Sequence, residues 1–115
     1  MSLDVYLYVD IDTGGENPHR VELFEANITH NLNTMADAAG CYEALWRPEE
    51  VGLTSAEQLI PILEESYQRL RENPQEFEKF NPENGWGSYA GLCRFVKNYL
   101  EACKEHPKAL VQADR

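Results

Sequence analysis

A stretch near the N-terminus alternates strictly between apolar and polar side chains. From Leu3 to Asp12, every odd position is leucine, valine or isoleucine, and every even position is aspartate or tyrosine. A period of two residues over ten positions is typical of a β-strand with one buried face. The pattern therefore predicts a strand over residues 3–12 whose odd positions, including Ile11, face a core.

The segment after this strand has the composition of a turn. Residues 13–18 include Gly14-Gly15, which permits positive φ, and Pro18, which ends strand pairing. Residues 20–26 then predict a return strand with Val21 and Leu23 facing the core, so that the two strands form a hairpin. Residues 109–114 again alternate and predict a third strand.

The middle of the chain has the signals of several helices. Asn27 or Thr29 can cap a helix that ends at Gly40, and residues 41–46 predict another turn or two of helix. This first helix has an apolar stripe at helical spacing, which comprises Ile28, Leu32, Met35, Ala36 and Ala39.

Three further helix starts follow. Thr54 and Glu57 have the spacing of a capping box, although Pro61 should interrupt the helix that they begin. Pro74 suits the first position of a short helix, and Ser88 can cap a helix over residues 88–106.

These elements predict one fold class. A chain of 115 residues suits one globular domain, residues 1–115, with enough surface buried to fold without staples. The order of strand, strand, helices and strand is that of an α+β fold. We expect a small antiparallel sheet, made of the N-terminal hairpin and the C-terminal strand, covered on one face by three to four helices.

Charge is distributed unevenly along the chain. The net charge is −10, but residues 1–65 alone have a net charge of −11 because Arg20 and Arg47 are their only basic residues. Such a half repels phosphate backbones, so we expect no nucleic-acid partner, and no apolar stretch is long enough to cross a membrane. An acidic surface of this kind either serves solubility or docks on a basic partner.

Cysteine usage bears on the compartment. Three cysteines, Cys41, Cys93 and Cys103, form neither a CxxC pair nor an even set, and no secretory leader is recognisable. These features favour a reducing, cytoplasmic location with all three thiols buried and inert.

No strong catalytic or cofactor motif occurs, so no cofactor and no metal are expected. Three islands of polar and aromatic residues remain as candidate binding sites. The junction segment (residues 27–33) contributes Asn27, His30 and Asn31, which can read a ligand by directional hydrogen bonds or serve only as helix caps. Asp10 and Asp12 with Glu25 and His30 form a weaker candidate for a metal site.

The other two islands each contain a tryptophan. In residues 45–50, Trp46 can stack a planar ligand whose anionic group pairs with Arg47, or Trp46 is core and Arg47 bridges to a nearby glutamate. In the Trp86 loop (residues 84–88), Asn84 precedes Gly85, and Trp86 lies between Gly85 and Gly87, where its indole either joins a site or plugs the end of the core. Each island lies near the end of an element, so the three can converge on one pocket.

Residues 27–32, 45–50 and 81–87 together resemble a group of small uncharacterised proteins from bacteriophage and prophage genomes. The resemblance covers most of the chain after the first hairpin. It implies the cytoplasm of an infected host cell and a small protein that binds or blocks a host component, and it transfers no catalytic residue.

The sequence therefore favours a non-enzymatic binding protein with a polar-aromatic pocket for a small planar or nucleotide-like ligand. The predicted ligand-binding residues are Asn27, His30, Asn31, Trp46, Arg47, Asn84 and Trp86. One alternative is an acidic module that docks on a basic surface of a host protein. Another is a small hydrolase that uses His30 as a general base.

Overall fold

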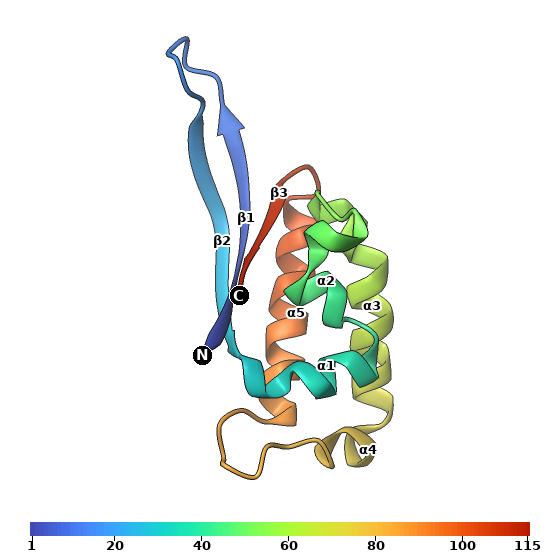
Figure 1. Cartoon of the computed structure of the whole chain (residues 1–115). Coiled ribbons are helices and arrows are strands. Elements are labelled where there is room, and N and C mark those ends of the chain that lie inside the picture. Colours follow the sequence, from blue (N-terminus) through green and yellow to red (C-terminus); the bar gives the residue numbers. More distant parts are fainter.

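The computed structural model describes the whole chain, Met1 to Arg115. It contains an antiparallel three-stranded sheet in the order β2-β1-β3, with a layer of helices on one side (Figure 1). The predicted α+β class is confirmed. The elements are β1 (Ser2–Ile11), β2 (His19–Thr29), η1 (His30–Leu32), α1 (Asn33–Ala39), α2 (Tyr42–Trp46), η2 (Pro48–Val51), α3 (Ala56–Glu72), α4 (Pro74–Glu78), α5 (Tyr89–Glu105) and β3 (Leu110–Asp114).

β1 is the central strand, and its alternating side chains determine where the core lies. Leu3, Val5 and Leu7 are completely inaccessible to solvent. Leu7 is paired with Phe24 of β2, whose ring stacks on Tyr99 of α5 with the ring centroids 5.7 Å apart. The odd positions from Leu3 to Leu7 thus share one core with α5, as the alternation predicts.

The far end of the hairpin differs from the prediction. Ile11 is 47% exposed, and every residue from 10 to 20 is exposed. β3 pairs with β1 only between Asp4 and Tyr8, and the helices do not extend past that point (Figure 1). Residues 10–20 therefore project from the body as a hairpin arm, and the molecule measures 53 Å along its longest axis.

β2 contains a bulge that reverses one predicted orientation. Leu7 pairs with Phe24, whereas the next residue, Tyr8, pairs with Glu22, so Leu23 is the additional residue. Leu23 is exposed, and Phe24 takes the inward place instead. The expectation that Leu23 faces the core was wrong, because an inserted residue shifts the inward set by one position.

The junction between β2 and the helices lies further along the chain than the sequence predicts. β2 continues through Thr29, so Asn27 lies inside the strand and caps no helix. The Thr29 hydroxyl oxygen accepts a hydrogen bond from the Asn31 backbone N–H at 3.3 Å and thereby caps η1, after which α1 begins at Asn33. The predicted apolar stripe from Ile28 to Ala39 is nevertheless buried.

α3 begins one residue later than the sequence predicts. Its N-cap is Ser55 rather than Thr54, and the side chain of Gln58 takes the part predicted for Glu57. The Gln58 Oε1 accepts hydrogen bonds from the Thr54 and Ser55 backbone N–H groups at 2.8 and 3.1 Å. The helix continues through the exposed Pro61, so the interruption predicted there does not occur.

The two later helices begin where the sequence predicts. Pro74 occupies the first position of α4, which buries Phe77 and leaves Phe80 exposed just after it. The Ser88 Oγ accepts a hydrogen bond from the Gly91 N–H at 3.1 Å and caps α5. This cap marks the end of the Trp86 loop.

The three cysteines are all free thiols, but they are not equally buried. Cys41 and Cys103 are inaccessible, and burial raises the pKa of each thiol to about 12. Cys93 is only half-buried, contrary to the prediction for all three, although burial raises its pKa as well.

Candidate functional site

Two of the three predicted islands meet in one surface pocket at the end of the sheet. The pocket has a volume of about 710 Å³ and lies where β2 passes into η1. We call it the Trp86 pocket. It is lined by Met1, Ser2, Asn27, Thr29, His30, Asn31 and Trp86.

Close backbone contact brings the Trp86 loop to the junction segment. Gly87 has a φ of +98°, and a Cβ at this position would lie 2.7 Å from Thr29 Cγ2 and 3.0 Å from Leu32 Cγ. Asn31 Nδ2 donates hydrogen bonds to Asn84 Oδ1 and to the Trp86 carbonyl oxygen, both at 3.4 Å. The close packing at Gly87 and the hydrogen bonds of the Asn31 side chain thus hold the Trp86 loop against the junction segment, although the two are more than fifty residues apart in the chain.

Trp86 is the aromatic surface of the pocket. Its side chain is 72% exposed, so the alternative that it plugs the end of the core was wrong. The Asn84 side chain fixes the loop, because Asn84 Oδ1 also accepts a hydrogen bond from the Trp86 backbone N–H at 3.0 Å. An indole held by its backbone and open to solvent is a suitable surface for stacking.

Asn27 enters the pocket from the solvent-facing side of the sheet. It pairs with Asp4 across the β1–β2 ladder, and its Nδ2 donates to Asp4 Oδ1 at 2.7 Å and to Ser2 Oγ at 2.9 Å. The role of Ser2 was not predicted, because the pairing register that places it beside Asn27 is not apparent from the sequence.

His30 connects the pocket to the third island. Its ring meets Trp46 edge-on, with the ring centroids 6.3 Å apart. His30 Nε2 and Trp46 Nε1 are both buried, and neither has a hydrogen-bond partner. No hydrogen bond joins the His30 ring to a serine, a cysteine or a carboxylate.

Trp46 itself lies in the core rather than on the pocket surface. It is 2% exposed and stacks on Tyr42, with the ring centroids 5.6 Å apart. It therefore has no open face for a ligand and reaches the Trp86 pocket only through its contact with His30.

Arg47 does not line the Trp86 pocket. Its Nε donates to Tyr42 Oη at 3.1 Å and its Nη1 to Glu50 Oε2 at 2.6 Å. These hydrogen bonds, to Tyr42 first and then Glu50, raise the pKa of the Arg47 guanidinium. The contacts are those of the structural alternative, in which Arg47 bridges to a nearby glutamate.

The candidate metal residues are separated in space. Asp10 and Asp12 belong to the exposed arm, where Asp12 Oδ1 accepts a hydrogen bond from the Gly14 N–H at 2.9 Å. His30 lies at the opposite end of β2, and no group of three or more histidine, cysteine or acidic side chains gathers anywhere in the structure.

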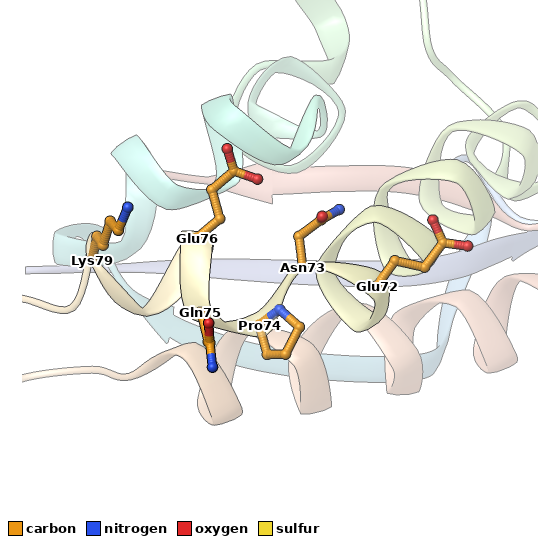
Figure 2. Close-up of a pocket in the computed structure, with 6 residues that line it drawn as sticks. All are labelled: Glu72, Asn73, Pro74, Gln75, Glu76 and Lys79. Carbon is orange, nitrogen blue, oxygen red and sulfur yellow. The ribbon is translucent and has the colours of Figure 1, made fainter.

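Another hollow, of about 470 Å³, lies where α3 passes into α4 and is lined by Glu72, Asn73, Pro74, Gln75, Glu76 and Lys79. Glu76 and Lys79 point to one side of this short helix, and Gln75 points to the other (Figure 2). The hollow has no aromatic lining residue, so it lacks the exposed ring that characterises the Trp86 pocket.

Comparison with family models, curated proteins and solved structures found no match. None of the helices combines the length and the apolar character that crossing a bilayer requires.

Proposed function

We propose that the protein is a binding protein whose Trp86 pocket holds a small planar or nucleotide-like ligand. The observation that supports the proposal is the convergence of an exposed indole, two carboxamides and an imidazole at one pocket. Stacking on Trp86 would supply much of the affinity, and the polar side chains would select the ligand.

A ligand screen tests this proposal. Nucleosides, nucleotides and other planar metabolites are examined by thermal shift, and each hit is titrated by calorimetry. We expect Trp86→Ala and Asn31→Ala to abolish binding of a true ligand. Phe80→Ala is the matched control, because Phe80 is also an exposed aromatic but lies outside this pocket. Binding that persists in Trp86→Ala would contradict the proposal.

Arg47 is examined with the same hits, because the sequence predicts it as an anchor for an anionic group. Since its hydrogen bonds are made to Tyr42 and Glu50, we expect Arg47→Ala to lower the melting temperature and to leave the affinity unchanged. Loss of binding without a change in melting temperature would instead support the anchoring role.

A second candidate function is docking on a basic protein surface, and the projecting arm favours it. Asp10, Asp12 and Glu16 belong to the hairpin arm, which projects from the body (Figure 1), and all three are exposed. Docking of this kind should weaken steeply as ionic strength rises, whereas stacking in the Trp86 pocket should not.

A further inference from the structure

Building on the proposed function, we infer that the Trp86 pocket accepts a planar cation with several N–H donors, namely a guanidinium or amidinium group. The inference comes from the hydrogen-bonding groups that the pocket leaves free. These groups indicate which chemical class of ligand the pocket would bind.

Asn27 offers the pocket an acceptor. A carboxamide has two N–H donors, and the structure uses both, toward Asp4 Oδ1 and Ser2 Oγ. The Asp4 carboxylate can only accept, so the Asn27 side chain cannot reverse its amide group without losing this bond. Its Oδ1 accepts no hydrogen bond from the protein and remains available to a donor.

Asn31 repeats this arrangement on the other side of the pocket. Its two N–H donors are used by Asn84 Oδ1 and by the Trp86 carbonyl oxygen. A carbonyl oxygen can only accept, which fixes the orientation of this amide as well. Asn31 Oδ1 is therefore a second free acceptor in the same lining.

His30 also lines the pocket, but its unpaired ring nitrogen is not open to a ligand. Its Nε2 is buried without a hydrogen bond. Because this nitrogen has almost no accessible surface, a ligand cannot reach it without a movement of the His30 side chain. The free acceptors open to a ligand are therefore Asn27 Oδ1 and Asn31 Oδ1. A guanidinium has five N–H donors in one plane and no acceptor, which complements this set of groups.

The electrostatic setting also favours a cation. His30 has the only basic side chain in the lining, and the other cationic group there is the α-amino group of Met1. Asp4 lies directly behind Asn27, and Glu25 and Asp114 occupy the same face of the sheet. Burial and these carboxylates raise the pKa of the neighbouring Tyr6.

Trp86 can hold the flat face of such a cation. Guanidinium groups stack on aromatic rings through cation–π attraction, and tryptophan is the strongest partner for this contact. The same sheet face already contains one example, because the Arg20 guanidinium lies 3.9 Å from the centre of the Tyr8 ring. A guanidinium fills little of the 710 Å³ volume, so the group belongs to a larger ligand, either a small molecule or an arginine side chain of a polypeptide.

Titration of the ¹⁵N-labelled protein tests the inference, since NMR spectroscopy detects weak binding. The probe is N-acetyl-arginine amide, compared with N-acetyl-lysine amide and adenosine monophosphate. We expect the arginine probe to shift the Trp86 indole N–H and the Asn27 and Asn31 side-chain amide signals in a saturable manner. The lysine probe, which is not planar, and the anionic nucleotide should bind about tenfold more weakly or not at all.

Variants locate the binding. Trp86→Ala and Asn31→Ala should weaken the arginine probe by about tenfold or more, and Asn33→Ala should have no effect, because Asn33 is an exposed asparagine outside the pocket. Should Asn31→Ala disturb the loop, as shown by its melting curve, Asn27→Ala provides the same test from the strand side.

The outcomes separate this inference from the function on which it rests. If adenosine monophosphate binds in a Trp86-dependent manner and the arginine probe does not, the inference is wrong and the proposed function stands. If no planar probe shows Trp86-dependent binding, both are wrong. If the arginine probe binds, two further probes identify the source of the guanidinium group. They are agmatine and a heptapeptide whose only charged side chain is a central arginine. Equal affinity indicates a small molecule, and much tighter binding of the peptide indicates a polypeptide.

Discussion

At the scale of single residues, Gly87 determines whether the Trp86 pocket exists. Its positive φ and its contact with Thr29 both exclude a side chain, whereas Gly85, two residues earlier, has a φ of +78° and open space around it. Comparing substitutions at these two glycines therefore separates two contributions to the loss of stability, namely the unusual backbone conformation and the close approach of neighbouring atoms.

Gly87→Ala should displace the Trp86 loop from the junction segment. We expect a loss of about 2–4 kcal/mol in the free energy of unfolding, of which the backbone conformation contributes roughly 1–2 kcal/mol. Gly85→Ala should lose only the backbone part. Urea denaturation measures both, and equal losses would show that the contact of Gly87 with Thr29 is unimportant.

The buried thiols predict how stability responds to alkaline pH. In the unfolded chain the thiols of Cys41 and Cys103 ionise near their ordinary pKa, but burial raises the pKa of each to about 12 in the folded protein. Between about pH 9 and pH 12 the folded state therefore binds more protons, so stability falls as pH rises. The slope should approach about 1.4 kcal/mol per pH unit for each thiol.

The measurement is urea denaturation from pH 8 to pH 11 with the wild type and a Cys41→Ala, Cys103→Ala double variant, whose curve should be flatter. Native labelling at pH 8 provides a second check. Cys93 should react before Cys41 and Cys103, and simultaneous reaction of all three would contradict their different burial.

At the scale of elements, β1 is one strand with two environments. Its first half pairs with both β2 and β3 beneath the helices, and its last residues pair with β2 alone. The alternation of apolar and polar side chains is identical in both halves. The sequence pattern therefore does not show where along β1 the layer of helices ends.

Val5→Asp and Leu7→Asp should unfold the domain, because each places an unpaired charge in the core at a cost of several kcal/mol. Ile11→Asp is the matched control in the same strand and on the same face. It should change stability by less than about 1 kcal/mol, since Ile11 is half exposed. Circular dichroism during urea denaturation compares the three variants, and a stable Val5→Asp protein would disprove the packing of β1 on the helices.

The elements also show which features a sequence can predict. The alternation of side chains predicted β1 and β3, and Pro74 and Ser88 predicted the starts of α4 and α5. These patterns depend only on residues that are close together in the sequence. The bulge at Leu23 and the extension of β2 through Thr29 depend on pairing with β1, which is a long-range property. For the same reason the sequence marked Asn27, Asn31 and Trp86 individually but could not show that they share a pocket.

At the scale of the whole molecule, the structure joins a helical body to a two-stranded projection. A helix rises about 1.5 Å per residue and a strand about 3.3 Å per residue. The seventeen residues of α5 therefore span a shorter distance than the ten residues of β1, even before the turn is added. The mismatch leaves the hairpin arm without helices beneath it.

The arm has a consequence for the time scale on which different parts of the sheet exchange their amide protons with water. In the arm a backbone hydrogen bond is broken by separating two strands, with little apolar surface exposed, whereas at Val5 and Leu7 it requires opening the core. We expect the β1 amides beyond Tyr8 to exchange orders of magnitude faster than those before it. A partner that binds the arm would slow exchange there, and because it binds only the folded hairpin, it would also raise the free energy of global unfolding by linkage.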